Sequence, residues 1–290
     1  MSASLEQQLP TPRDVEGWVA PQAVPTPAWQ GFRDLLGRRW LAVFSALVLI
    51  FLFVPVLVTI LFSFNDNLGR FNFVWQGVTL RHWQNACGVP GLCGAMIQSL
   101  QVAALSTLIA TILGTLIAFA LVRYRFRGRG PTNLALFLPM ATPEIVMGTS
   151  LLALFLNLGM QRGFRTIIIG HIMFNISFVV VTVKARLQGQ DANLEEAAMD
   201  LYADEWTTFR KVTLPLAMPG IIAGALLAFA LSFDDFVITN FVSGNTITFP
   251  MFVWGAAQRG IPPQVNVMAT LMFIVAMSAA LIALVVQRRR

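Results

Sequence analysis

Residues 195–219 decide how this chain is interpreted. The segment reads Glu-Glu-Ala-Ala-Met-Asp-Leu-Tyr over 195–202, then nine further residues, then Val-Thr-Leu-Pro over 212–215, with a second proline at 219. It is a charged segment between two apolar stretches, in a chain that is otherwise strongly apolar. Its residues can first be interpreted by physical chemistry alone.

The segment from 191 to 211 predicts two short helices joined by a turn. Asp191 is a candidate N-cap, and acidic residues crowd the first helical turn. Tyr202-Ala203-Asp204 is the expected turn. Trp206 and Phe209 then give the second helix an apolar face, and we expect Leu214-Pro215 to end that helix. The exposed apolar residues need a partner protein or the membrane surface, and the acidic character disfavours anionic lipid. An ordinary amphipathic cytosolic loop is the alternative.

Composition places the rest of the chain in a lipid bilayer. The chain is 56% hydrophobic and only 12% charged, against about 25% charged residues in a typical soluble domain. Six apolar stretches approach or exceed the roughly 20 residues needed to span a membrane. The sequence therefore predicts an all-α membrane protein with six spans, near 40–64, 96–122, 133–158, 166–183, 219–242 and 265–287.

The basic residues predict the orientation, because cytosolic segments of membrane proteins are enriched in lysine and arginine. With the N-terminus inside, fifteen of the 20 basic residues are cytosolic, in the groups Arg13, Arg33, Arg38, Arg39; Arg123, Arg125, Arg127, Arg129; Lys184, Arg186, Arg210, Lys211; and Arg288, Arg289, Arg290. The other five are Arg70, Arg81, Arg162, Arg165 and Arg259. We therefore expect both termini, and the acidic segment, in the cytosol. The net charge of +6 reflects this topology, so no nucleic-acid partner is expected, and the arginines of 123–131 are expected to meet membrane lipid.

Two regions are predicted along the chain. Residues 1–37 are polar and proline-rich, and we expect a cytosolic tail. The first apolar run is too long for a signal peptide, so we expect an uncleaved anchor. Residues 38–290 form the membrane domain, with a cytosolic loop over about 191–218.

The spacing of the charged segment resembles the EAA signature of bacterial ABC importer permeases, E-A-A-x3-G-x9-I-x-L-P. The resemblance implies a segment that docks on a separate ATPase, through Glu195, Glu196, Ala197, Ala198, Asp200, Tyr202, Leu214 and Pro215. Tyr202 occupies the family's glycine position. Because tyrosine adopts a positive φ at a cost, we expect a reshaped turn or altered docking there.

Three carboxylates fall inside the predicted spans: Glu144, Asp234 and Asp235. A charge at the bilayer centre costs roughly 2.5–3.5 kcal/mol on insertion scales, so such residues usually face a cavity or a partner. Helical rise places Glu144 roughly 17 Å and Asp234 roughly 22 Å from the cytosolic ends of their spans. We expect a path for cations, led by Asp235; a structural hydrogen-bonding pair is the alternative.

The residues around these carboxylates resemble the spermidine/putrescine permease subunits among the ABC importers. The matching stretches are Ser63-Phe64-Asn65, Pro143-Glu144-Ile145-Val146-Met147, Ser232-Phe233-Asp234-Asp235-Phe236-Val237 and Pro263-Gln264-Val265-Asn266. The resemblance implies the six-helix type I importer permease fold in the bacterial cytoplasmic membrane, moving polyamines by alternating access. It also implies four kinds of partner: two copies of an ATPase that binds ATP and magnesium, a second permease, an extracytoplasmic binding protein and the polyamine substrate.

The remaining candidate residues are few. Cys87 and Cys93 lie in a predicted outside loop, where a disulfide can persist; a bridge and two free thiols both remain open. His171 and Asn175 share a helix face, and we expect a packing histidine rather than a metal ligand. No phosphate-binding G-x-x-x-x-G-K-[ST] loop occurs, so no cofactor, no metal and no catalysis are expected in this chain.

Three other functions are alternatives for this sequence. The first is the same permease role for another substrate, such as iron, another organic cation, sulfate or phosphate; the membrane carboxylates disfavour anions. The second is a secondary transporter driven by protons through Glu144, Asp234 and Asp235. The third is an intramembrane enzyme, for which the sequence offers no nucleophile–base pair.

Overall fold

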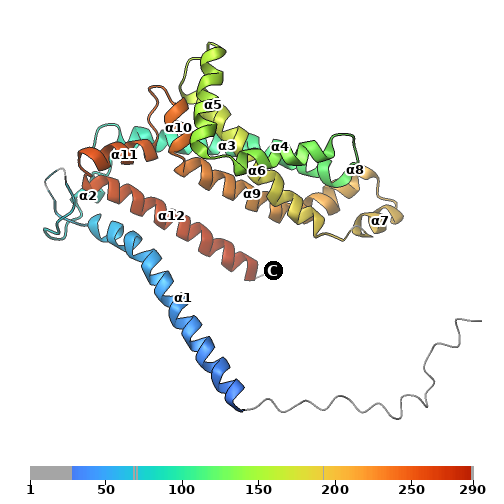
Figure 1. Cartoon of the computed structure of the whole chain (residues 1–290), viewed down its shortest axis with the longest axis horizontal. Helices are drawn as coiled ribbons and strands as arrows, with labels where there is room; N and C mark the ends of the chain where they lie inside the picture. The colour runs from blue at the N-terminus through green and yellow to red at the C-terminus, as the bar shows by residue number, and fades with distance from the viewer. Residues whose placement is uncertain (1–27, 68, 70, 192, 289–290) are drawn as a thin grey trace, which may run out of the picture. The chain divides into compact units, whose positions relative to one another are not determined.

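The computed structural model describes residues 28–67, 69, 71–191 and 193–288, and within them it contains helices and no strand (Figure 1). A single isolated bridge pairs Asn65 with Val78 in the loop after the first helix. The expected all-helical architecture is therefore confirmed for the described residues.

The first helix, α1 (Ala28–Phe62), is long enough to cross a membrane by itself. Its stretch Trp40–Phe62 has a mean hydropathy of 3.0, and Pro55 lies inside it. Residues 1–27 of the predicted tail lie outside the described residues, whereas residues 28–37 form the first turns of the helix. Most of the large apolar side chains between Trp40 and Val58 are exposed around the helix, as expected for a segment that lipid surrounds.

The residues from Thr59 onward form a compact unit. Its helices are α2 (Arg81–Gln84), α3 (Leu92–Arg123), α4 (Arg129–Ala141), α5 (Glu144–Asn157), α6 (Phe164–Gln188), α7 (Asn193–Asp200), α8 (Glu205–Thr208), the π-helical turn η2 (Phe209–Thr213), α9 (Leu214–Asp234), α10 (Val237–Val242), α11 (Phe249–Arg259) and α12 (Pro263–Arg288).

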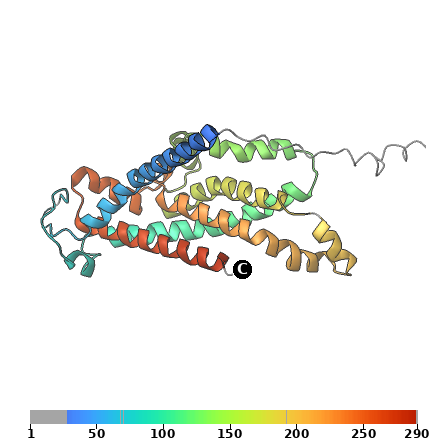
Figure 2. The ribbon, with the colours of Figure 1, turned by 90° about the horizontal axis from the view of Figure 1, so that it is seen from below.

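Helices α3, α6 and α9 lie side by side and form the core of this unit (Figures 1 and 2). Small residues let them approach closely, as is usual between membrane helices. A Cβ atom on Gly114 of α3 would lie 2.7 Å from Cγ1 of Val179 on α6, and one on Gly224 of α9 would touch the same valine. Val179 is fully buried between the two glycines.

The short helices gather at opposite ends of the bundle. Helices α7 and α8 lie at one end, and α2 and α11 at the other (Figure 1). Near the second end, α5 packs against α10 through Leu151 and Ile238, which share one apolar cluster with Ile167 of α6. The two ends therefore carry the predicted cytosolic and outside loops separately.

The described residues contain five helices that are long and apolar enough to span a membrane, and one bent pair that could supply a sixth span. The expected third span, 133–158, is not one helix. It is divided into α4 and α5, which meet at an angle of 107°. Thr142 is extended and Pro143 precedes α5, because a residue before proline avoids helical backbone angles and proline itself donates no hydrogen bond.

The expected fifth span, 219–242, is also wrong at its outer end. Helix α9 ends at Asp234, Asp235 has an extended backbone with ψ 122°, and α10 starts afresh at Val237. The span thus stops at the pair of aspartates instead of running through them.

The second loop helix does not end at Leu214-Pro215 as expected. The π-helical turn η2 joins α8 directly to α9, and Pro215 falls in the first turn of α9. Proline is tolerated in a first helical turn, so here it starts the long helix rather than stopping the short one. The end of the charged segment is therefore continuous with the long apolar helix α9.

Candidate functional site

The acidic segment is tied to the bundle by Glu195. Its Oε1 accepts a 2.7 Å hydrogen bond from the Thr213 hydroxyl and a second hydrogen bond from the Arg123 guanidinium. Arg123 also donates to the Thr213 hydroxyl at 3.0 Å. One carboxylate thus joins α7 to the C-terminal end of α3 and to the turn that precedes α9. Of the predicted docking residues, Glu195 is directed toward the helix bundle itself.

The opposite side of this segment is exposed and mixes acidic with apolar groups. We define the coupling surface by the exposed residues Glu196, Ala197, Met199, Asp200, Leu201, Tyr202 and Trp206. Ala198 is half-buried beside them, Leu214 is half-buried and Pro215 is exposed at the start of α9. Exposed apolar side chains of this size suit a protein partner more than solvent.

Tyr202 keeps the left-handed turn that the expected glycine would make. Its φ is 63°, the only positive value among the described non-glycine residues. Its N–H donates to the Met199 carbonyl at 2.9 Å, and the next N–H, of Ala203, donates to the Ala198 carbonyl at 3.2 Å. These are the two bonds of a Schellman helix end. The expected reshaping of the turn is therefore wrong, and the tyrosine ring is fully exposed at the tip of the coupling surface.

An aromatic ladder leads from the coupling surface into the bundle. Trp206 stacks on Phe209 with ring centroids 5.9 Å apart, and Phe209 meets Phe119 of α3 edge-on at 5.6 Å. Phe119 belongs to the buried cluster that joins α3, α6 and α9. At the start of α8, the Thr207 hydroxyl donates to Asp204 and lowers the pKa of that carboxyl. The contacts of Trp206 with Phe209, and of Phe209 with Phe119, therefore connect the coupling surface to the buried core, so a displacement of Trp206 can be transmitted by side-chain packing.

At the C-terminal end of α9, Asp235 lies in a buried polar network. Its Oδ2 accepts hydrogen bonds from the N–H of Thr239 at 2.8 Å and from the Thr239 hydroxyl at 2.7 Å. It also lies 3.2 Å from Nε2 of His171 on α6. The aspartate therefore holds the first turn of α10 against α6.

The network continues from His171 into two more helices. Its Nδ1 lies 2.6 Å from the Ser232 hydroxyl of α9, which lies 2.9 Å from the Ser106 hydroxyl of α3. A continuous chain of polar contacts thus links α3, α9, α6 and α10. Asn175, one turn along α6 from His171, is fully buried and has no hydrogen-bond partner among the described residues.

The other two predicted path residues lie elsewhere. Asp234, the last residue of α9, is exposed, and Glu144 is exposed in the first turn of α5. None of the ion pairs among the described residues includes either carboxylate. The depth expected for Glu144 assumed a single straight span, and the bend before α5 removes that assumption.

His171 is a buried, hydrogen-bonded packing histidine, as the sequence predicts, but the sequence does not reveal its partners. Its three polar neighbours are Ser232 of α9, Thr239 of α10 and Asp235 between these two helices. The sequence did carry one signal for the contact between His171 and Asp235. Each of the two residues lies inside an apolar stretch with no arginine or lysine nearby, so each needs a polar partner within the bundle.

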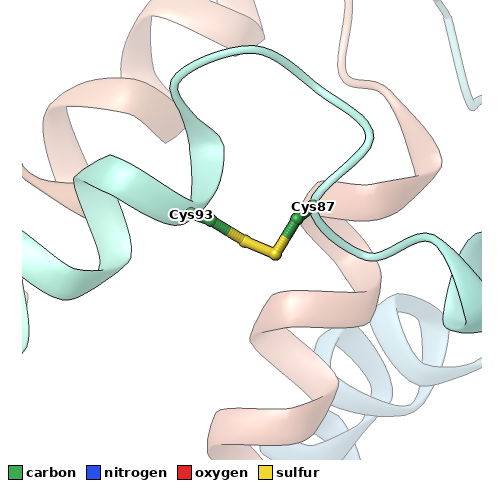
Figure 3. The surroundings of a disulfide bond; sticks show 2 residues. All are labelled: Cys87 and Cys93. Carbon is green, nitrogen blue, oxygen red and sulfur yellow. A yellow bond between two sulfur atoms is a disulfide. The ribbon is translucent and has the colours of Figure 1, made fainter.

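Cys87 and Cys93 are joined by a disulfide with Cα atoms 5.4 Å apart (Figure 3). Gly91 within the bridged loop has a φ of 83°, which glycine adopts without strain. The bridge lies at the end of the bundle that carries α2 and α11, beside the apolar cluster of Leu92, Met96 and Phe249. Among the described residues no group of three histidine, cysteine, aspartate or glutamate side chains could hold a metal ion.

Comparisons with known proteins confirm the family that the sequence resembles. The family model described as binding-protein-dependent transport system inner membrane component matches residues 110–289. The spermidine/putrescine transport system permease protein PotC of Escherichia coli (strain K12) is 41% identical over 244 residues, covering 84% of this chain and 92% of that protein. The putrescine transport system permease protein PotI of the same strain is 39% identical over 240 residues, covering 80% and 85%.

Solved structures agree with the fold. A bacterial alginate ABC transporter, in complex with an alginate pentasaccharide-bound periplasmic protein, contains a chain that matches with a TM-score of 0.66 at 18% identity. The match covers 90% of this chain and 97% of that one. A chain of an amino acid ABC transporter matches with a TM-score of 0.56 at 15% identity over 73% of this chain. Sequence, fold and membrane helices lead to one assignment: the chain belongs to the binding-protein-dependent transport system inner membrane components, and it is a multi-pass protein of the bacterial inner membrane.

Proposed function

We propose that the chain is a permease subunit of an ATP-driven importer that moves polyamines, spermidine or putrescine, across the cytoplasmic membrane by alternating access. The observation that carries this proposal is the identity of 41% with a spermidine/putrescine permease along 92% of that protein's length. Exposed carboxylates at Asp234 and Glu144 suit a cationic substrate and disfavour sulfate or phosphate.

The proposed partners follow from the family and from the two ends of the bundle. An ATPase, present in two copies and holding ATP and magnesium, docks on the coupling surface and on Ala198, Leu214 and Pro215. A second permease completes the translocation path, and an extracytoplasmic binding protein delivers the substrate to the end that carries α2 and α11. In this assembly the chain itself hydrolyses nothing, and it transmits ATP-driven movement through Trp206 and Phe209 into α9.

We propose six spans, with the α4–α5 pair as the third, and both termini in the cytosol. The fifteen basic residues on the predicted inner side support this orientation. The disulfide supports it independently, because such bridges persist on the oxidising side of the membrane. A reporter enzyme that is active only in the cytosol should be active when fused at residue 290 and inactive when inserted between residues 87 and 93.

We propose different roles for the three membrane carboxylates that the sequence groups together. Asp234 and Glu144 are accessible and are assigned to the substrate path. Asp235, which the sequence analysis placed first on that path, is bonded to Thr239 and His171 and is assigned to holding the outer end of the bundle. Removing its charge would then affect transport through the position of α10.

The proposed function is tested by uptake in proteoliposomes. The chain is reconstituted with its companion ATPase, second permease and binding protein, and entry of labelled spermidine and putrescine is followed with and without ATP. ATP-dependent accumulation supports the proposal. Accumulation by the chain alone under a pH gradient would instead indicate a proton-driven secondary transporter, and ATP-dependent uptake of another solute with no polyamine uptake would reassign the substrate.

A further inference from the structure

The loop between α1 and α3 is built around one buried amide, that of Asn65. The amide nitrogen donates 2.7 Å hydrogen bonds to the side-chain oxygen of Asn72 and to the Val74 carbonyl, and the amide oxygen accepts from the Gln76 N–H at 2.7 Å. Asn65 is fully buried and belongs to the stretch Ser63-Phe64-Asn65, to which the proposed function gives no role. The described residues of this loop are therefore held in one conformation by the protein itself.

The same loop is fixed to the start of α12, which lies far along the chain. The Asn72 N–H donates to the Ile261 carbonyl at 3.3 Å, and Nε2 of Gln264 lies 3.3 Å from Nδ1 of His82 in α2. Helix α2 accordingly lies beside the N-terminal end of α12 (Figure 1). Gln264 belongs to Pro263-Gln264-Val265-Asn266, the other matching stretch without an assigned role. The two stretches therefore contribute to one surface.

A polar pocket of about 390 Å³ lies between this loop and the start of α12. Arg81 and Asn85, which line it, are exposed, whereas His82 beside them is only 6% exposed. Asn67 and Gln264 complete the polar part of the lining, and no carboxylate is among the described residues that line the pocket. The pocket thus presents guanidinium, imidazole and amide nitrogens without an acidic side chain.

Two of these nitrogen donors lack an acceptor. The amide nitrogen of Gln264 can only donate, so Nδ1 of His82 accepts and the proton of the neutral ring is on Nε2. Burial and the neighbouring Arg81 lower the pKa of His82, which keeps the ring neutral. Nε2 has no hydrogen-bond partner among the described residues. Nη2 of Arg81 donates to Asp66 at 2.8 Å, and the rest of that guanidinium has no partner among them either.

The sequence makes the surrounding surface basic. The segments that the proposed orientation places outside contain one acidic residue, Asp66, and five arginines, Arg70, Arg81, Arg162, Arg165 and Arg259. A surface of one sign attracts a partner of the opposite sign and fixes its register where single charges pair. Because the pocket lies between polar loops rather than on an apolar helix face, a protein that arrives from outside suits it better than lipid.

We propose that this pocket receives an acidic side chain of the extracytoplasmic binding protein. The planar guanidinium of Arg81 suits a carboxylate, and Asn85 adds an amide N–H at the exposed rim. His82, beneath the rim, supplies the N–H for which its own chain gives no acceptor. The proposal rests on the proposed function, which supplies the binding protein, and adds the place and the chemistry of its recognition.

The test measures the affinity of the polyamine-loaded binding protein for the complete transporter, with ATPase retention as the measure of assembly. Arg81→Glu should weaken this affinity about tenfold or more, because it places a carboxylate against the incoming one. His82→Leu should weaken it about threefold, in line with one lost hydrogen bond, and His82→Gln should stay closer to wild type because it keeps an N–H donor.

Two control variants separate the pocket from general effects. Asp66→Asn breaks the same ion pair as Arg81→Glu but keeps the guanidinium charge, so the affinity should be unchanged or higher. Arg259→Glu reverses another exposed arginine, which lines a different pocket, and should change the affinity less than twofold in the absence of a paired carboxylate. A photo-crosslinking residue at position 85 should capture the binding protein at a segment that contains aspartate or glutamate.

Wild-type affinity in both Arg81→Glu and His82→Leu overturns the inference, while the proposed function stands as long as the wild-type complex imports polyamine. Equal weakening by Arg81→Glu and Arg259→Glu would show a general attraction between charged surfaces and also overturn it. A loss in Asp66→Asn as large as that in Arg81→Glu would assign the effect to the stability of the loop, again against the inference. A wild-type complex that imports no polyamine contradicts the proposed function itself.

Discussion

Nε2 of His171 lies 3.2 Å from Oδ2 of Asp235, and the two side chains are only 1% and 5% exposed. The Thr239 hydroxyl donates to the same carboxylate oxygen, so its own oxygen accepts from Nε2 of His171 at 2.9 Å. Nε2 of His171 thus faces two oxygen atoms, those of Asp235 and Thr239. Nδ1 is left to contact Ser232, and the histidine becomes the junction of three helices.

Asp235→Ala should destabilise the complex far more than Asp235→Asn. Alanine leaves His171 and the Thr239 N–H without a buried acceptor, which costs about 1–3 kcal/mol for each group. Asparagine keeps one carbonyl oxygen in the position of Oδ2 and should preserve most of the stability, with reduced uptake because α10 is held less firmly. Thermal unfolding of the purified complex and uptake of labelled spermidine check the two expectations.

A double-mutant cycle that combines Asp235→Ala with His171→Gln tests whether the two residues interact or pack independently. If the aspartate acts through the histidine, the two substitutions should be strongly non-additive in unfolding free energy. Additive effects would contradict the link, and unchanged uptake and stability in Asp235→Asn would reduce the role of the charge to a replaceable hydrogen bond.

Glu196→Lys should release the ATPase while the permease remains inserted and folded. Glu196 is exposed on the coupling surface, and charge reversal opposes a partner that fits an acidic helix. Co-purification of the ATPase and ATP-dependent uptake should both be lost. Normal retention and transport would show that the coupling surface is not the docking site.

Glu195 is the matched control for Glu196, because it is the adjacent glutamate and is directed toward the helix bundle rather than outward. Glu195→Ala breaks its bonds to Thr213 and Arg123, so it should lower the stability of the permease alone. Because these groups are partly exposed, the expected loss is only about 1 kcal/mol. Thermal unfolding of the isolated permease measures it, and an unchanged midpoint would contradict the structural role of the tie.

Tyr202→Gly should be tolerated and should slightly stabilise the loop. The residue has a φ of 63° and forms both bonds of the helix end, and glycine adopts that conformation without the roughly 1–2 kcal/mol paid by other residues. Tyr202→Val should give a less stable loop than either tyrosine or glycine, because the branched Cβ of valine crowds a backbone with positive φ. Hydrogen exchange at Ala203 and ATPase retention report the two effects; loss of assembly in Tyr202→Gly would assign the ring itself to docking.

The sequence predicts the helical class, the family and most span positions because membrane spans carry their signal in length and composition. It misses what depends on a few backbone angles. The breaks at Thr142-Pro143 and Asp235 lie within apolar runs that read as continuous, although Pro143 was itself a visible signal. The conformation of Tyr202 was misjudged because the cost of a positive φ is small enough for two backbone hydrogen bonds to offset.

In the candidate site, too, the sequence predicts which residues matter but not how they are placed relative to one another. Sequence reasoning found the three carboxylates, since any charge in an apolar stretch is visible without a structure. Because neighbouring helix positions lie about 100° apart, the sequence indicates that Asp234 and Asp235 face different ways, but it does not say which of them faces the bundle, and it ranked Asp235 first on the path. It also left His171 apart from Asp235, because 64 residues separate them and their contact depends on how α6 packs against α10.

The Cys87–Cys93 bridge should be present in protein taken from the bacterial inner membrane. Mass spectrometry of unreduced, alkylated and digested protein should give one linked peptide pair, and reduction before alkylation should add two alkyl groups. Replacing both cysteines with serine should lower the stability of the complex by ~2 kcal/mol in the loop-entropy view, since the closed loop is short. The effect should be confined to the end of the bundle that carries α2 and α11, leaving ATPase retention unchanged. Two alkylated thiols in the unreduced sample would contradict the bridge and would also remove one of the two arguments for an extracytoplasmic location of this loop.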